Sequence, residues 1–113
     1  MRVDRDYILD IANAISRIEK HSGKGRKAYD EIEEIQVWMA YYLQIIGEAA
    51  SHLSDNLKRK HSDIPWEDII GMRVILVHKY FAVDYDIVWD AVVNDVPILK
   101  EIVTGYLKEN PSS

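Results

Sequence analysis

An apolar stretch of the sequence, MRVILVHKY at residues 72–80, contains three side chains suited to chemistry: Arg73, His78 and Tyr80. Arginine is rarely buried without a partner, and its guanidinium binds phosphate oxygens bidentately while staying charged. Histidine titrates near neutral pH and can act as a general base or a general acid. The stretch therefore combines residue types that a phosphate site would use.

The spacing of these residues leaves two interpretations open. Arg73 and Tyr80 lie at i and i+7 and share a helix face, but His78 lies roughly 140° around an ideal helix from Arg73. In the structural interpretation, which spacing alone favours, Arg73 pairs with a carboxylate such as Glu48 or Asp68, and His78 complements a helix dipole. In the functional interpretation, the side chains converge on one ligand.

A second basic feature is the run LKRKH at residues 57–61, which places Lys58, Arg59 and Lys60 near a helix C-terminus. Its structural explanation is compensation of the helix dipole together with solvation. Its functional explanation is contact with phosphate groups, which makes these three residues candidate RNA contacts.

Composition excludes several other classes of site. The sequence has no cysteine, so disulfides and thiolate ligands are absent. The other three histidines have no partner at metal-ligand spacing and no HExxH motif is present, so we expect neither a metal nor another cofactor. The formal net charge of -5 argues mildly against a protein that coats nucleic acid in general, but not against a local basic site.

Length and hydropathy favour one cytoplasmic domain. The 113 residues suffice for a single domain, which we expect over residues 1–110 with a disordered tail at 111–113. No apolar run approaches the about 18 residues of a membrane span. The acidic N-terminal residues do not fit a signal peptide.

Apolar residues at helical spacing predict an all-α fold. The 3–4 spacing indicates helices over Ile8–Ile18, Ile35–Leu57, Pro65–Tyr80 and Val88–Tyr106, and no alternating strand pattern is present. Pro97 should kink or split the last helix, because proline cannot donate the helical hydrogen bond. Four such helices predict an antiparallel four-helix bundle.

The third of these helices is apolar on every side, which requires cover on every side. One small bundle face cannot supply that cover, so we expect a homodimer.

Asp84 is a good N-cap for the fourth helix.

The stretch IPWEDIIGMRVILVHKYFAVDYDIVW at residues 64–89 closely resembles the HepT-like branch of the HEPN superfamily. Members carry arginine, four residues, histidine, one residue and tyrosine, which match Arg73, His78 and Tyr80. The stretches IIGEAASHLS and VWDAVVNDVPILKE are also similar. The resemblance implies a HEPN-type bundle that dimerises with its motif helices at a shared cleft. Val74 departs from the family, because many relatives have asparagine after the arginine.

The resemblance also implies a function. Such proteins are metal-independent ribonucleases and toxins of toxin–antitoxin pairs, with Arg73 and His78 as the implied catalytic residues. The implied partner is an MntA-like nucleotidyltransferase antitoxin that attaches AMP to Tyr80, so a higher hetero-oligomer is also expected to form.

Two hypotheses follow from this resemblance. In the first, the 2′-hydroxyl of RNA attacks the phosphate, one His78 of the dimer acts as base and its mate as acid, and Arg73 stabilises the developing charge. In the second, the protein is a non-catalytic helical module that docks a nucleotidyltransferase.

Overall fold

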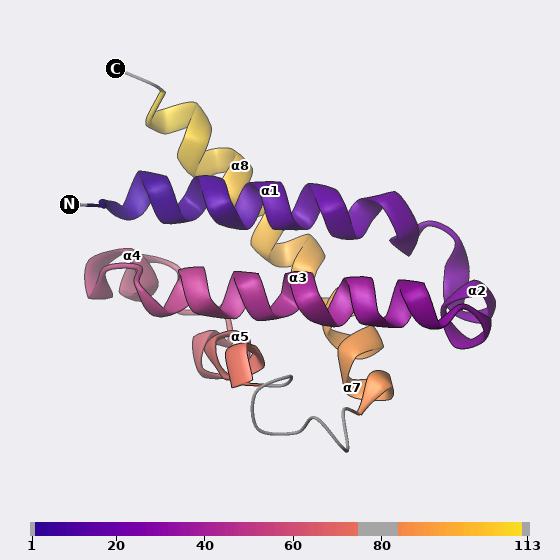
Figure 1. The fold of residues 1–113 in the computed structure, drawn as a ribbon. Helices are drawn as coiled ribbons and strands as arrows, with labels where there is room; N and C mark the ends of the chain where they lie inside the picture. The colour runs from indigo at the N-terminus through magenta and orange to yellow at the C-terminus, as the bar shows by residue number, and fades with distance from the viewer. Residues whose placement is uncertain (1, 75–83, 112–113) are drawn as a thin grey trace.

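The computed structural model describes residues 2–74 and 84–111, and every regular element in these ranges is helical. Two long helices, α1 (Asp4–Ser22) and α3 (Glu33–Ser51), run antiparallel and are joined through the short helix α2 (Gly25–Glu31), as Figure 1 shows. The prediction of an all-α bundle is confirmed. No helix in the described ranges is long and apolar enough to cross a membrane.

The core lies between α1, α3 and the C-terminal helix α8 (Val96–Glu109). The buried face of α1 is a stripe of isoleucines at 3–4 spacing, and α3 and α8 present aliphatic side chains to it. The most deeply buried of these are Ile8, Ile11, Ile18, Met39, Leu43, Ile46 and Leu99, each at most 1% exposed. Burial of these side chains is the main favourable term for the bundle.

The predicted continuous helix over Ile35–Leu57 is divided in the structure, because α3 ends and a short helix α4 (Asp55–Lys60) begins after a three-residue break. Ser54 is the N-cap of α4. Its hydroxyl oxygen accepts a hydrogen bond from the Leu57 N–H at 3.2 Å, while its own N–H and hydroxyl donate to the Asp4 carboxylate at 2.8 and 2.6 Å. The apolar spacing continues across the break, so it did not reveal the N-cap.

The helix predicted over residues 65–80 is α-helical only at its start. Helix α5 (Trp66–Gly71) is followed by a 3₁₀ turn, η1 (Met72–Val74), and residues 75–80 lie outside the described residues. Pro65 occupies the N-cap position of α5 and not its first turn.

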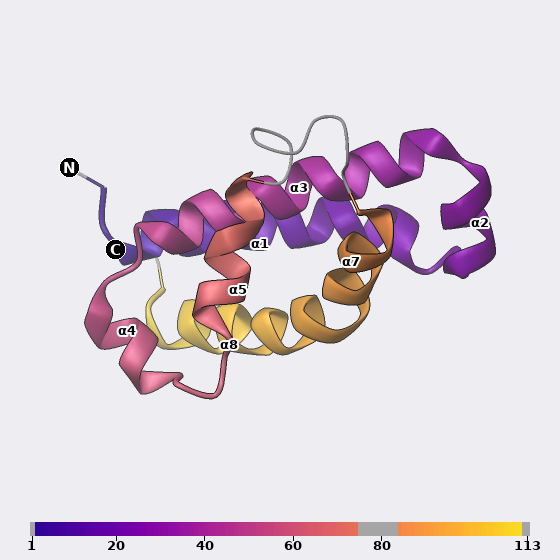
Figure 2. The same ribbon diagram turned by 90° about the horizontal axis from the view of Figure 1, so that it is seen from below.

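The last predicted helix is interrupted as expected. Helix α7 (Tyr85–Asp90) passes through a π-helical turn, η2 (Ala91–Asp95), into α8, which carries Pro97 in its first turn. Proline lacks the N–H that would continue the α-helical pattern, and the widened turn lies immediately before it. The view from below in Figure 2 shows the resulting bend between α7 and α8.

Candidate functional site

Arg73 lies in η1, where the chain packs closely against α3. The contact depends on Gly47: a Cβ at this position would lie 2.6 Å from the Arg73 backbone nitrogen and 2.8 Å from the Ile69 carbonyl oxygen. Both neighbours are backbone atoms, so no flexible side-chain end can move aside. Gly47 therefore fixes the backbone of Arg73 against α3. The sequence patterns assigned Gly47 no role, although a glycine inside a helical pattern is a recognised sign of close packing.

The side chain of Arg73 is exposed, not buried in the apolar stretch that contains it. Its side chain is 44% exposed, and its Nη1 atom lies 4.0 Å from Oε2 of Glu48 on α3. Of the two carboxylates that the sequence offered as partners, Glu48 is the one beside the guanidinium. Exposure at a protein surface leaves the guanidinium within reach of a ligand phosphate.

Glu48 also contacts a histidine that sequence reasoning set aside. His52, the residue that follows the last residue of α3, lies one turn later, and its Nε2 atom donates to Oε1 of Glu48 at 3.2 Å. The donor assignment follows because an ionised carboxylate only accepts hydrogen bonds. The two oxygens of Glu48 thus face two different side chains.

The first turns of α1 support His52. The Tyr7 ring stacks on the His52 ring with centroids 4.9 Å apart and an interplanar angle of 16°. The Arg2 guanidinium lies 4.5 Å from the Tyr7 centroid and pairs with Asp10 at 2.7 Å. Together with Glu48 these residues line a surface cavity of about 330 Å³.

His78 and Tyr80 lie outside the described residues, in the segment 75–83 that joins η1 to α7. The structure describes the chain on either side of this segment. On the N-terminal side, the backbone of Ile69 and Arg73 packs against Gly47, and we call these three residues the N-terminal anchor.

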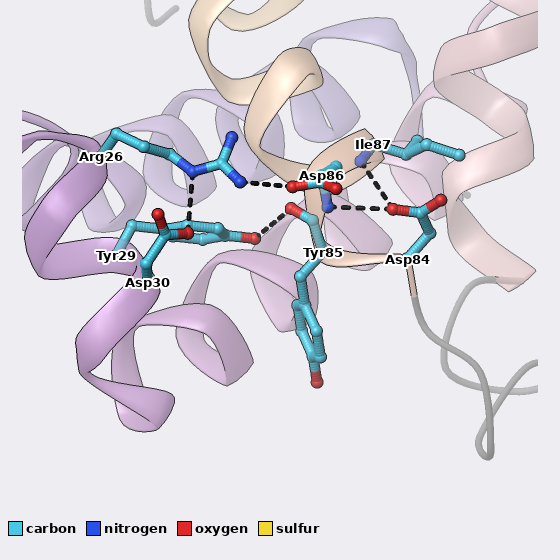
Figure 3. A network of polar contacts seen from close by, with 7 residues as sticks. All are labelled: Arg26, Tyr29, Asp30, Asp84, Tyr85, Asp86 and Ile87. Carbon is cyan, nitrogen blue, oxygen red and sulfur yellow. Dashed lines mark hydrogen bonds and ion pairs between the residues drawn. The ribbon is translucent and has the colours of Figure 1, made fainter.

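On the C-terminal side, the start of α7 is held by a polar network that Figure 3 shows. We call it the C-terminal anchor, and its residues are Arg26, Tyr29, Asp30, Asp84, Tyr85 and Asp86. Asp84 caps α7 by accepting from the N–H groups of Asp86 and Ile87 at 3.0 and 3.2 Å, which confirms the N-cap prediction. The buried Tyr29 hydroxyl donates to the Tyr85 carbonyl at 2.6 Å. Burial raises the pKa of Tyr29, so the phenol remains a donor at neutral pH.

Arg26 completes the C-terminal anchor. It donates to Asp30 within α2 at 2.8 Å and to Asp86 at the start of α7, and these hydrogen bonds raise its pKa. As Figure 3 shows, its guanidinium lies between the two carboxylates and so joins α2 to α7.

A groove of about 440 Å³ lies between the elements that carry the two anchors. α5 and α7–η2 form its walls, and its lining includes the carboxylates of Glu67, Asp68, Asp90 and Asp95. Such a groove disfavours the binding of a polyanion.

The basic run lies away from Arg73. Trp66, the first residue of α5, donates to the Lys58 and His61 carbonyls, whereas Arg73 lies in η1 beyond the other end of α5. Lys58 lies 3.9 Å from Asp55, and Arg59 donates to Asn56 at 2.6 Å. These contacts fit the structural explanation of the run, and the fold does not bring it together with Arg73.

Metal ligation has no framework in the part of the chain that the structure describes: residues 2–74 and 84–111 contain no group of three or more histidine, aspartate or glutamate side chains placed to hold an ion.

Comparison with known proteins matches residues 11–105 to a family described as Ribonuclease HepT-like. A "Probable ribonuclease HepT" of Thermococcus cleftensis is 36% identical over 102 residues, covering 88% of this chain and 91% of that protein. A "Putative RNase" of Methanocaldococcus jannaschii is 30% identical over 104 residues, covering 92% of this chain and 81% of its own.

A further "Putative RNase", from Caldanaerobacter subterraneus subsp. tengcongensis, is 42% identical over 67 residues, which cover 59% of this chain and 60% of that protein. No solved structure gave a significant match. The family match spans most of the chain and includes both anchors, whereas Arg2, Tyr7 and Asp10 precede it. The chain therefore belongs to the HepT-like ribonuclease family.

Proposed function

We propose that this protein is a metal-independent ribonuclease of the HEPN type and the toxin of a toxin–antitoxin pair. The observation that carries the proposal is the exposed guanidinium of Arg73, whose backbone is fixed on Gly47, in a chain whose relatives are named ribonucleases. An exposed guanidinium on a closely packed backbone is suited to holding a phosphate of RNA.

The chemistry requires a base, an acid and positive charge. The 2′-hydroxyl of RNA attacks the adjacent phosphorus as one His78 accepts its proton, and the second His78 of a two-fold dimer protonates the departing 5′-oxygen. Arg73 stabilises the charge on the phosphorane. The products are a 2′,3′-cyclic phosphate and a free 5′-hydroxyl, and no metal is required.

Tyr80 is the proposed control point. An MntA-like nucleotidyltransferase would transfer AMP from ATP to the Tyr80 hydroxyl and release pyrophosphate. The new phosphate carries about one negative charge, which can pair with Arg73 and repel RNA. Charge and bulk therefore both oppose cleavage.

A ribonuclease assay in the presence of EDTA tests the catalytic proposal. Wild type should cleave RNA and leave cyclic phosphate ends, whereas Arg73→Ala and His78→Ala should lose cleavage and keep their melting temperatures. His21→Ala is the matched control, because His21 lies near the C-terminal end of α1, where it contacts Trp38 and Lys24. Loss of wild-type activity in EDTA, or full activity of either motif variant, would contradict the mechanism.

Intact-mass spectrometry tests the control point. After incubation with the nucleotidyltransferase and ATP, wild type should gain AMP units and lose cleavage, whereas Tyr80→Phe should gain none and remain active. Equal modification of both proteins would contradict the role of Tyr80.

The proposed homodimer is tested by sedimentation at micromolar concentration, where a single monomeric species would rule it out.

Lys58, Arg59 and Lys60 are proposed as a second binding surface for the RNA backbone. Each is replaced with glutamine, and the RNA association constant is measured over a range of salt concentrations. The slope of its logarithm against the logarithm of the salt concentration should become shallower by about one for each phosphate contact that is lost.

A docking module without cleavage is the second candidate function, and the four carboxylates of the α5–α7 groove favour it, since they suit a basic protein partner better than RNA. Growth arrest on expression of the protein alone, relieved by His78→Ala, would decide for the nuclease. Absence of any toxicity or cleavage would decide for the docking module.

A further inference from the structure

Glu48 stands between two basic side chains, and each of its oxygens serves a different one. Oε1 accepts a hydrogen bond from His52 Nε2 at 3.2 Å, and Oε2 lies 4.0 Å from Nη1 of Arg73. The first distance is that of a hydrogen bond, but the second is too long for one. The carboxylate is therefore bound to His52 and only near Arg73.

This asymmetry matters because a carboxylate and a phosphate compete for the same edge of a guanidinium. Both bind it through two parallel N–H···O bonds, and the paired geometry is the strong one. A carboxylate bound bidentately to Arg73 would occupy the donors that a phosphate needs. With Oε1 bound to His52 and Oε2 4.0 Å from Nη1, Glu48 does not make the bidentate pair with Arg73.

The surrounding contacts restrict the geometry on both sides. Tyr7 stacks on His52 and so limits the positions that its ring can adopt. Gly47, the residue before Glu48, fixes the Arg73 backbone against the same turn of α3. These contacts favour the arrangement in which the carboxylate is bound to His52 and not to Arg73.

We propose that His52 is a positioning residue that binds the Glu48 carboxylate and so keeps the Arg73 guanidinium available for the RNA phosphate. The inference rests on the proposed function, because it assumes that Arg73 binds RNA. His52 acts here through Glu48 and does not touch the substrate.

A double-mutant cycle on RNA affinity tests this role. The probe is a fluorescent 2′-O-methyl oligonucleotide, which lacks the nucleophile and cannot be cleaved, and the readout is its Kd from anisotropy. His52→Ala should raise the Kd about two- to fivefold, the range expected for an exposed ion pair that now forms with Glu48. The double variant Glu48→Gln/His52→Ala should bind as tightly as Glu48→Gln alone, because a neutral amide competes weakly for Arg73.

Two further variants separate positioning from a structural effect. His52→Gln keeps an N–H donor for Glu48 and should retain the wild-type Kd. His21→Ala is the control for removing a histidine from the far end of the bundle and should also leave the Kd unchanged. If His52→Ala weakened binding by misfolding the protein, adding Glu48→Gln would not restore the Kd. A restored Kd in the double variant therefore shows that His52 acts through Glu48.

Several outcomes would overturn the inference. These are an unchanged Kd in His52→Ala, a double variant as weak as His52→Ala, or RNA binding that Arg73→Ala does not weaken. The proposed function is judged separately, by wild-type cleavage and its loss in Arg73→Ala and His78→Ala. If wild type cleaves RNA but the effects of His52→Ala and Glu48→Gln on the Kd simply add, the role of His52 is rejected and the proposed function is not.

Discussion

The chain before segment 75–83 and the chain after it are held by different physical means. At the N-terminal anchor, the backbone of Ile69 and Arg73 packs directly onto Gly47 of α3. At the C-terminal anchor, side chains of α2 hold the start of α7 through the Tyr29–Tyr85 hydrogen bond and the Arg26–Asp86 pair. One anchor depends on the absence of a side chain, and the other depends on several side chains acting together.

This difference indicates how each anchor should respond to substitution. At the N-terminal anchor the neighbouring atoms belong to the backbone and cannot rotate away. A methyl group added at Gly47 must therefore displace α3, α5 or η1. The C-terminal anchor divides its interactions between one buried hydrogen bond and exposed ion pairs, and loss of any one leaves the others. The position of Arg73 should therefore be the more sensitive of the two.

Gly47→Ala should have the largest effect. The new Cβ meets backbone atoms at 2.6 and 2.8 Å, so we expect the free energy of unfolding to fall by about 1–3 kcal/mol, with reduced RNA cleavage because Arg73 is displaced. Chemical denaturation and the cleavage assay measure the two effects.

Gly105→Ala is the matched control, because a Cβ at Gly105 meets no described atom within 4 Å. Removing a glycine from the interior of α8 should raise stability by about 0.5–1 kcal/mol. Equal behaviour of the two variants would show that the N-terminal anchor is not a tight backbone contact.

Tyr29→Phe should have an intermediate effect. It removes the hydroxyl that donates to the Tyr85 carbonyl, and we expect a loss of about 1 kcal/mol in the free energy of unfolding. Because burial raises the pKa of Tyr29, the loss should be the same at neutral and mildly alkaline pH. Denaturant melts at the two pH values measure it, with Tyr41→Phe, on a half-exposed ring, as control.

Arg26→Gln should cost less, because its ion pairs with Asp30 and Asp86 are exposed. We expect a loss smaller than that of Tyr29→Phe, and we expect it to disappear at roughly 1 M salt, where exposed charges are screened. Thermal melts at low and high salt measure the difference. A loss larger than that of Tyr29→Phe, or one unaffected by salt, would reverse the ranking within the C-terminal anchor.

Asp95→Asn should have the smallest effect and the opposite sign. Burial, together with the charge of Asp68, raises the pKa of Asp95 above its ordinary 3.8. The folded protein then binds this proton more tightly than the unfolded chain, so the stabilisation is present below pH 3.8 and is lost as pH rises through the folded pKa. Asparagine should therefore raise the melting temperature slightly at neutral pH, and the gain should vanish in acid. A melting temperature lowered at neutral pH would show that the groove does not disfavour this carboxylate.

Much of the secondary structure was predictable from local patterns. The isoleucines of α1, the N-cap at Asp84 and the interruption near Pro97 each depend on residues within a few positions of one another. The same local reasoning was wrong where a distant residue intervened, because Asp4 of α1 holds the Ser54 cap that separates α3 from α4.

The sequence by itself determined the helical class, the family resemblance and Arg73 as a candidate, because helix periodicity and motif spacing are properties of the chain alone. It offered Glu48 and Asp68 equally as partners for Arg73, and it assigned Gly47 and His52 no role. Only the tertiary structure decided these points. Glu48 and Arg73 are neighbours because η1 packs on α3 at a glycine, and Asp68 is not, because it faces the groove on the other side of α5. Contacts between elements follow from how their surfaces fit together, and a single sequence specifies that fit only through the whole packed core.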